Sequence, residues 1–279
     1  MPELPEVETV KNTLKQNVLH RQIKDVKVYF PKIIKNVSQD EFINGLVGEE
    51  IIDIARRGKY LIFIFNKHIL VSHLRMEGKY NLMQNEERSK HEHVIFEFVD
   101  GYNLRYHDVR KFGTMHLYPK IDILKLYELE PLCNVAPDVF SEDFNFEETF
   151  LKFQKSNKHI KTLLLDQTVI SGIGNIYADE ILFRCKIHPL ELAKNITFEK
   201  YNEIIENTKI VLNKAITLGG TTIKSFTSSH SITGRFQNEL LVHTKKVCPE
   251  CGENLIKIKV GGRTSYICGS CQKMIDKAN

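Results

Sequence analysis

The chain opens with Met1-Pro2-Glu3-Leu4-Pro5-Glu6, and a helix is predicted to begin within this stretch. Apolar residues recur at spacings of three and four, at Leu4, Val7, Val10, Leu14 and Val18. That spacing places them on one face of an α-helix. Pro5 suits the first turn because its φ is preset and an amide hydrogen is not needed there. The acidic residues would lie at the positive end of the helix dipole, where carboxylates are favoured.

The same stretch contains a potential nucleophile. Removal of Met1 would leave Pro2 as a chain-terminal secondary amine. Terminal amines have an ordinary pKa near 8, so part of the population is unprotonated at neutral pH and can attack an electrophilic carbon. Glu3 adjoins this amine and Glu6 follows three residues later, as acid/base groups would. The alternative is that Met-Pro is an ordinary chain start and that the carboxylates only stabilise the N-terminal end of the helix through its dipole.

Short β-branched and aromatic runs, separated by turn residues, follow this helix. The predicted strands are Asp25–Phe30, Ile51–Ala55, Tyr60–Phe65, Ile69–His73, Lys79–Met83, His93–Val99, Tyr102–His107 and Gly113–Tyr118. Asp100-Gly101 between two of the runs is a strong hairpin signal. Short strands at regular spacing indicate an antiparallel β-sandwich, so we predict a first domain over residues 1–120.

A helical domain is predicted over residues 121–237. Ile160–Asp166 and Asn175–Cys185 are helices joined by a Gly-containing turn, which predicts a helix-turn-helix arrangement with Asn175 as an N-cap. Backbone amides before the second helix could bind a DNA phosphate; a tight turn without a ligand is the alternative. The loop 219–237 loses periodicity and is predicted to be a functional lid or a disordered segment.

Four cysteines form two Cys-x2-Cys pairs separated by sixteen residues. This spacing predicts one structural Zn²⁺ on a β-hairpin in residues 238–279, held by Cys248, Cys251, Cys268 and Cys271. Two disulfides would need an oxidising compartment, for which the sequence carries no signal. Gly261-Gly262-Arg263 is predicted at the hairpin tip, where Arg263 is either a phosphate ligand or a solvated arginine.

Length and charge agree with a multidomain protein that has one anion-facing side. The 279 residues allow two or three domains, and the net charge is only +4. Residues 235–279 carry eight Lys/Arg against four Asp/Glu, whereas residues 138–148 carry five acids and no base. This segregation suits an anionic partner. No apolar run reaches the length of a membrane span, and no signal peptide is expected.

Together these motifs resemble the bacterial formamidopyrimidine-DNA glycosylase (8-oxoguanine DNA glycosylase) family over the whole chain. Besides the zinc motif, the resemblance rests on Pro2–Thr9, Arg57–Tyr60, His73–Gly78, Asp108–Gly113 and Asp166–Tyr177. It implies an α+β multidomain fold. The parts are an N-terminal antiparallel β-sandwich with an N-terminal helix, a helix-two-turn-helix domain with a lesion-capping loop at 219–237, and a C-terminal zinc β-hairpin finger.

The resemblance implies a bifunctional DNA glycosylase and AP lyase of base excision repair that removes oxidised purines. Pro2 would attack C1′ of a flipped nucleotide, and the resulting Schiff base would allow β,δ-elimination. Glu3 would be the acid/base, Lys59 and Arg263 would complete the catalytic set, and Glu6 would support it. From the residues alone, the preferred interpretation of Lys59 is a basic turn residue, and the alternative for Glu6 is a helix-end carboxylate.

The resemblance also assigns the DNA contacts. Phosphates would be held by His73, Lys161, Asn175 and Arg263. Met76 would fill the vacated space, Arg110 would donate to the orphaned cytosine, and Phe112 would wedge a base step. From the residues alone, a satisfied strand-end histidine is an equal alternative for His73, and Met76 and Phe112 are of residue types that ordinarily lie in the core. The lesion pocket would contain Glu77, Thr221, Thr222, Ile223, Lys224, Ser225 and Phe226.

One segment departs from the family pattern. Val242-His-Thr-Lys245 stands where the family more often has an aromatic residue followed by Gly-Arg, so His243 and Lys245 would have to replace any phosphate contact there. We expect a cytoplasmic, nucleoid-associated bacterial monomer that binds double-stranded DNA with an oxidised purine or abasic site. Two alternatives stay open: an endonuclease VIII-like glycosylase for oxidised pyrimidines, and a non-catalytic zinc-dependent DNA-binding protein.

Overall fold

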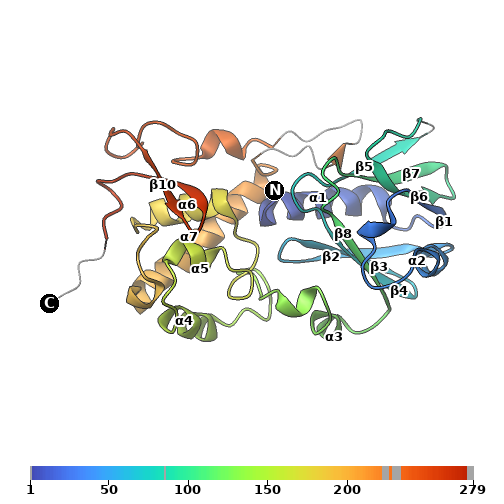
Figure 1. Cartoon of the computed structure of the whole chain (residues 1–279), viewed down its shortest axis with the longest axis horizontal. Coiled ribbons are helices and arrows are strands. Elements are labelled where there is room, and N and C mark those ends of the chain that lie inside the picture. The colour runs from blue at the N-terminus through green and yellow to red at the C-terminus, as the bar shows by residue number, and fades with distance from the viewer. Residues whose placement is uncertain (1, 85, 222–225, 228–233, 275–279) are drawn as a thin grey trace. The chain divides into compact units, whose positions relative to one another are not determined.

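The computed structural model describes residues 2–84, 86–221, 226–227 and 234–274. The chain forms two compact units (Figure 1): Met1–Leu132 with Gly219–Gly234, and Cys133–Leu218 with Arg235–Asn279. The fold is α+β, with sheets in the first unit and mainly helices in the second. Within the described ranges, no helix is long and apolar enough to cross a membrane.

Helix α1 (Leu4–Val18) begins where the sequence predicted, because Glu3 and Glu6 close a capping box at its N-terminus. The Glu3 amide donates to Oε2 of Glu6 over 2.9 Å. The five predicted apolar positions are at most 1% exposed. They face strands β2 (Ile51–Arg57) and β3 (Tyr60–Phe65), so the apolar stripe fixes the helix against a sheet.

Two sheets make the predicted sandwich. One has the order β2-β3-β4-β8 and is antiparallel throughout; the other has the order β1-β6-β7-β5-β9, and only its β5–β9 pair is parallel. The remaining strands are β1 (Ile23–Val28), β4 (His68–His73), β5 (Lys79–Gln84), β6 (Glu92–Phe98), β7 (Tyr102–His107), β8 (Thr114–Pro119) and β9 (Phe226–Thr227). All eight predicted strands are present, with ends shifted by at most two residues.

The core of the first unit lies between these sheets and includes α1 and α2 (Gln39–Leu46). Phe42, Phe63, Tyr80 and Phe96 are buried in it. Each such side chain stabilises the fold by about 1.5–3 kcal/mol. The strand ends are thereby fixed. Most predicted site residues of this unit lie at the start of α1 or on connections between strands, whereas His73 ends β4 and Phe226 lies in β9.

The second unit contains the predicted helix-two-turn-helix. Its helices are α4 (Phe146–Gln154), α5 (Ile160–Leu164), α6 (Asn175–Arg184) and α7 (Phe198–Thr217), whereas α3 (Ile123–Tyr127) belongs to the first unit. One prediction is corrected: Gly174, not Asn175, is the N-cap of α6. Asn175 is the first helical residue, and its Nδ2 donates to the carbonyl of Thr264 over 3.0 Å. Its side chain therefore ties the helix to the C-terminal hairpin.

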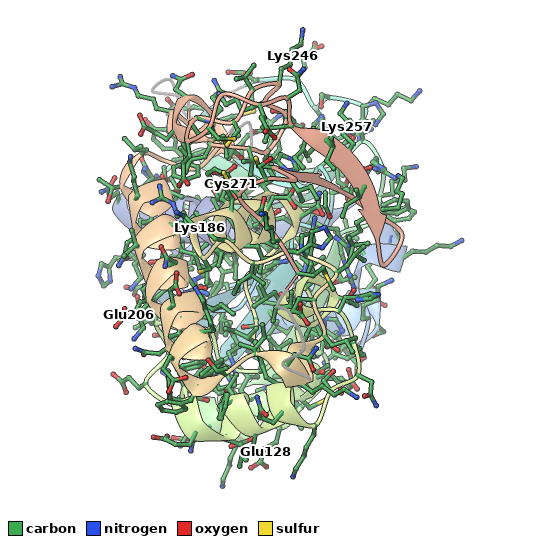
Figure 2. All side chains as sticks on the ribbon, turned by 90° about the vertical axis from the view of Figure 1, so that its left-hand side faces the viewer. Glu128, Lys186, Glu206, Lys246, Lys257 and Cys271 are labelled. Carbon is green, nitrogen blue, oxygen red and sulfur yellow. The ribbon has the colours of Figure 1, made fainter. Side chains whose placement is uncertain are left out.

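Strands β10 (Ile256–Val260) and β11 (Arg263–Ile267) form the predicted hairpin, and both turn glycines have positive φ. Figure 2 shows Lys246 and Lys257 projecting outward from this finger. The hairpin groups with the helical unit because β11 packs on α6. Residues 219–234, expected with the helical domain, group instead with the first unit. Thr221 bonds to Glu6 and β9 pairs with β5, which explains this difference.

Candidate functional site

The start of α1 is a buried acidic site. Glu3 and Glu6 are 3% and 4% exposed, and Pro2 is half-buried beside them. Oε1 of Glu6 accepts from the Thr221 amide over 2.9 Å and from the Thr221 hydroxyl over 3.2 Å. A Cβ on Gly220 would lie 2.7 Å from that oxygen, so only glycine permits this approach. One carboxylate therefore holds both the residue after the amine and the beginning of the predicted lid.

Lys59 lies in the turn between β2 and β3, and His73 ends β4. Both are buried, and β-pairing sets Tyr60 opposite His73. Burial, helped by the charges of Arg75 and Lys59, lowers the pKa of His73 to about 3. Its Nδ1 accepts from the Arg75 amide over 2.8 Å, so the neutral ring carries its proton on Nε2. Nε2 of the neutral His73 ring is thus a hydrogen-bond donor at ordinary pH values.

The predicted void-filling residues lie on two exposed loops. Met76 is 40% exposed and Phe112 is 52% exposed, although such residues are ordinarily buried. The Arg110 guanidinium stacks over the Phe112 ring, 4.7 Å from its centroid. The two loops therefore present apolar and cationic groups to solvent, which is what insertion into a base stack needs.

Asp108, whose role the sequence reasoning missed, organises the second loop. Its fully buried carboxylate accepts from the amides of Arg110, Phe112 and Gly113 over 3.0, 2.9 and 2.9 Å. An aspartate that opens a loop commonly bonds the amides that follow it, so the order Asp108-x-Arg-x-Phe-Gly113 carried that signal.

Tyr106 was missed too, and it links the two exposed loops. A Cβ on Gly78 would lie 2.2 Å from the Tyr106 hydroxyl oxygen, and one on Gly113 would lie 1.7 Å from it. The hydroxyl is therefore packed against the backbone of both loops. Burial, followed by the nearby Asp108 carboxylate, raises the pKa of Tyr106 and keeps it neutral. No local sequence pattern indicates this contact.

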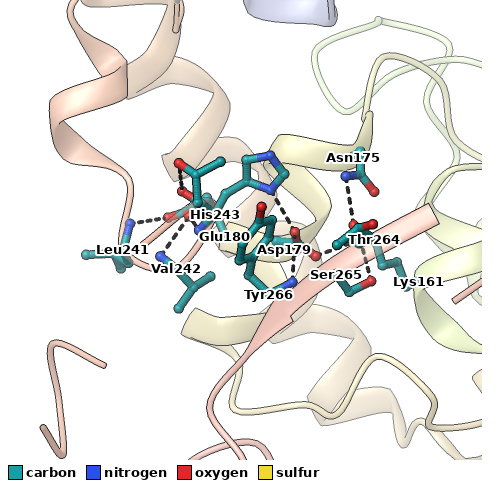
Figure 3. Close-up of polar contacts among 11 residues, drawn as sticks. Lys161, Asn175, Asp179, Glu180, Leu241, Val242, His243, Thr264, Ser265 and Tyr266 are labelled. Atoms are coloured by element: carbon teal, nitrogen blue, oxygen red, sulfur yellow. Dashed lines mark hydrogen bonds and ion pairs between the residues drawn. The ribbon is translucent and has the colours of Figure 1, made fainter. Parts of the chain in front are cut away.

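In the second unit, the structure corrects the role predicted for Lys161. Its side chain is completely buried, so it cannot contact a phosphate directly. Its ammonium lies 2.7 Å from Oδ1 of Asp179, 2.6 Å from the Ser265 hydroxyl and 3.4 Å from the Thr264 carbonyl (Figure 3). An ammonium has three donors, and these contacts can use all of them. Lys161 joins α5, α6 and the hairpin from inside.

Asp179 and Glu180 on α6, also missed, hold the segment before the zinc finger. Glu180 accepts from the amides of Leu241, Val242 and His243 over 2.7, 3.0 and 2.9 Å. Asp179 accepts from Nδ1 of His243 over 2.7 Å (Figure 3). Asn175 lies one turn earlier on α6, and Arg263 is exposed at the start of β11. The N-terminus of α6 and the hairpin tip thus form one polar face.

The four predicted cysteines come together as a metal site. Their sulfurs lie within 4.8 Å of one another, with Cys248–Cys271 at 3.8 Å and Cys251–Cys268 at 3.4 Å. A tetrahedral ion with Zn–S bonds of about 2.3 Å needs sulfur separations of about 3.8 Å. The donor set therefore fits one Zn²⁺, which would hold the ends of the hairpin together and leave no open position for catalysis.

The predicted lesion pocket is only partly described. Glu77 is exposed beside Met76, and Thr221 is buried against Glu6. Phe226 belongs to β9, where its backbone pairs with Tyr80. Thr222, Ile223, Lys224 and Ser225 lie outside the described residues.

Three family models match the chain. They are the formamidopyrimidine-DNA glycosylase N-terminal domain over residues 1–115, its H2TH domain over 135–227, and a zinc finger found in FPG and IleRS over 245–273. Formamidopyrimidine-DNA glycosylase of Mycoplasma pneumoniae is 48% identical, over 98% of this chain and 99% of its own length. That of Oceanobacillus iheyensis is 44% identical, over 98% of each.

Solved structures agree with these relatives. A complex of Lactococcus lactis Fpg with DNA that contains an abasic site aligns with a TM-score of 0.89 and 38% identity, covering 97% of this chain and 99% of that one. The acidic N-terminal site, the helix-two-turn-helix and the four-cysteine zinc finger together define a DNA glycosylase of the helix-two-turn-helix class. More particularly, the chain belongs to the formamidopyrimidine-DNA glycosylase family.

Proposed function

We propose that the protein is a bifunctional DNA glycosylase and AP lyase of base excision repair that removes oxidised purines, including 8-oxoguanine and formamidopyrimidines. The observation that carries this function is the buried Glu3–Glu6 arrangement beside Pro2, in a chain that matches the family along nearly its whole length. The endonuclease VIII-like alternative is disfavoured because the relatives reported above are named for formamidopyrimidine.

The reaction begins when the lone pair of the Pro2 nitrogen forms a bond to C1′ of the extruded nucleotide. The bond from C1′ to the base breaks, and the base leaves with the electron pair and with the proton that the Pro2 nitrogen gives up after it has formed its new bond. Glu3, held at the end of α1, protonates the ring oxygen as the sugar opens to an iminium. The iminium makes the C2′ proton acidic; the Glu3 carboxylate, now ionised, takes that proton, and the 3′ phosphate departs by β-elimination. The 5′ phosphate follows by δ-elimination, and hydrolysis frees the amine.

The remaining residues would bind DNA. In the first unit, Lys59 and the neutral donor His73 would hold phosphates near the reacting sugar, while Met76, Arg110 and Phe112 would occupy the vacated space. In the second unit, Asn175 and Arg263 would hold phosphates. Lys161 would act only through the groups it positions. We propose double-stranded DNA as the partner of a monomeric, cytoplasmic, nucleoid-associated protein.

Borohydride trapping tests this function. The wild type should form a covalent adduct with a duplex that contains 8-oxoguanine opposite cytosine, and Pro2→Gly should form none. Intact mass should show that Met1 is absent. Full-speed excision by a chain that retains Met1 would refute attack by Pro2. Faster excision of oxidised pyrimidines than of 8-oxoguanine would favour the alternative enzyme, and no adduct with wild type would favour a non-catalytic binder.

A further inference from the structure

His91 and His107 form a pair of neighbouring imidazoles that the proposed reaction does not use. His107 ends β7, and β-pairing places it opposite Glu92, the residue that follows His91. The two ring centroids lie 5.7 Å apart, and the ring planes make an angle of 69°. Both residues belong to the first unit, so the pairing of β6 with β7 alone holds the two rings beside each other.

Each ring of this pair has a buried nitrogen without a hydrogen-bond partner. Within the described ranges, Nδ1 of His91 and Nδ1 of His107 are both shielded from solvent, and neither is bonded to a protein group. Buried polar atoms of this kind are rare in native proteins, and each calls for an explanation such as a bound water or ion. Two of them on neighbouring rings are explained together by one shared ligand.

The spacing of the rings fits a metal ion bound between them. With metal–nitrogen bonds of about 2.0–2.1 Å, two imidazoles on one ion have ring centres about 5–6 Å apart. The observed 5.7 Å falls within this range. A metal ion binds the neutral form of imidazole. Burial, followed by the charge of Lys79, lowers the pKa of His107, so this ring is neutral at pH 7.

The charges and donors around the pair define the class of ion. Lys79 and Glu92 flank His107 on the two neighbouring strands with opposite charges, so the local charge does not exclude a cation. Oε2 of Glu92 is already bonded to Arg105 and to the Ser89 amide. Among the described residues, the cysteines form the one group of three or more potential ligands, so water would complete the coordination here. Imidazole ligands favour Cu²⁺, Zn²⁺ and Ni²⁺ over Mg²⁺ and Ca²⁺.

The pair is one hydrogen bond away from the 108–113 loop. The Asp108 amide donates to the His91 carbonyl over 3.0 Å, and Nε2 of His93 donates to the Asp108 carbonyl over 2.8 Å. Asp108 in turn holds the amides of Arg110 and Phe112. An ion that fixes the His91 side chain therefore restrains the residue to which the start of this loop is bonded.

We propose that His91 and His107 bind a divalent transition-metal ion of the Zn²⁺, Ni²⁺ or Cu²⁺ class, and that this ion restrains the 108–113 loop. Both rings coordinate it through Nδ1, and water fills the remaining positions. The ion is additional to the one that the four cysteines fit, because both histidines lie in the first unit and the cysteines in the second. The site is independent of the proposed enzymatic function.

Calorimetric titration of Zn²⁺ into the whole, zinc-loaded chain tests the site. Wild type should bind one further equivalent, and excess Mg²⁺ should not compete. Even partners outside the coordination sphere contribute about 10–100-fold to metal affinity, so His91→Gln and His107→Gln should each weaken binding by about tenfold or more. His107→Cys, which offers a thiolate, should still bind the ion. Absence of a further equivalent, or unchanged affinity in either glutamine variant, would overturn the inference.

A second pair of histidines provides the matched control. His159 and His188 both bond to Leu190, and both use Nδ1 to do so. Their Nδ1 atoms are therefore not available to a metal ion. His188→Gln should keep the wild-type affinity for the further equivalent, and a loss as large as that of His107→Gln would refute the assignment to His91 and His107.

Hydrogen exchange measures the restraint on the loop. The amides of Phe112 and Gly113, bonded to Asp108, should exchange more slowly after Zn²⁺ is added to wild type, and at an unchanged rate in His107→Gln. Equal rates with and without Zn²⁺ in wild type would refute the restraint. A chain that binds the ion at this pair but forms no borohydride adduct with lesion DNA contradicts only the proposed function.

Discussion

Replacing Asp108 with Asn should disorder the 108–113 loop, which carries Arg110 and Phe112, while leaving the Pro2 site intact. The asparagine oxygen can still accept from Arg110, but its NH₂ group would face the amides of Phe112 and Gly113, each now 2.9 Å from a carboxylate oxygen. Hydrogen bonds to charged groups contribute about 1.5–3 kcal/mol each, so losing two costs about 3–6 kcal/mol. At 1.4 kcal/mol per tenfold, the ordered loop would be depopulated more than about a hundredfold.

The assay is single-turnover excision of 8-oxoguanine opposite cytosine and opposite adenine. Asp108→Asn should lose about a hundredfold or more in rate opposite cytosine, and most of the preference for cytosine, because Arg110 is no longer positioned. Borohydride trapping on a single-stranded abasic oligonucleotide, which has no opposite base, should be unchanged. Asp40→Asn, which removes an equal charge from an exposed position on α2, is the matched control. Full discrimination by Asp108→Asn would refute this account of the loop.

Three further outcomes are expected. Thr244 has φ +65°, a conformation that glycine adopts without strain, so Thr244→Gly should raise the free energy of unfolding by about 1 kcal/mol. A lower melting temperature of this variant would contradict the expectation that Thr244 is strained. The pKa of His73 is lowered on folding, so the unfolded chain binds the extra proton and stability should fall as pH drops from about 6.5 towards about 3. His73→Gln should lack that part of the acid loss in denaturant titrations, and an identical pH profile would argue against it. Chelation should remove one zinc per chain and abolish binding to lesion DNA, and Cys268→Ser should have the same effect on binding. Unchanged affinity in fluorescence anisotropy would exclude the zinc finger from DNA contact.

Periodic patterns predicted most of this fold. The apolar stripe of α1 and the strands of the sandwich follow directly from residue spacing, because burial on one face dominates their energetics. Helix α2 was not predicted, although Ser38 and Glu41 form a capping box at its start. Eight residues give a short pattern, and only the core beneath Phe42 decides it.

The site was less predictable because its contacts join distant segments. The four cysteines could be assigned because two knuckles carry their own spacing rule. Lys161 could not be placed, since its burial depends on Asp179 and on Ser265, which is far along the chain. For the same reason, Asn175 reads locally as a cap, whereas its partner is Thr264 in the hairpin.

The Tyr106 hydroxyl oxygen packs against both Gly78 and Gly113, so the loop that carries Met76 and the 108–113 loop should accept substitutions only together. A side chain added at either glycine would displace that oxygen and disturb the neighbouring loop as well. If these loops contact DNA as proposed, exchanging them between relatives should succeed only when Met76, the 108–113 segment and Tyr106 are exchanged together. Chimaeras in which only one of the two loops is exchanged should lose the proposed DNA contacts of Met76 and those of Arg110 and Phe112 together.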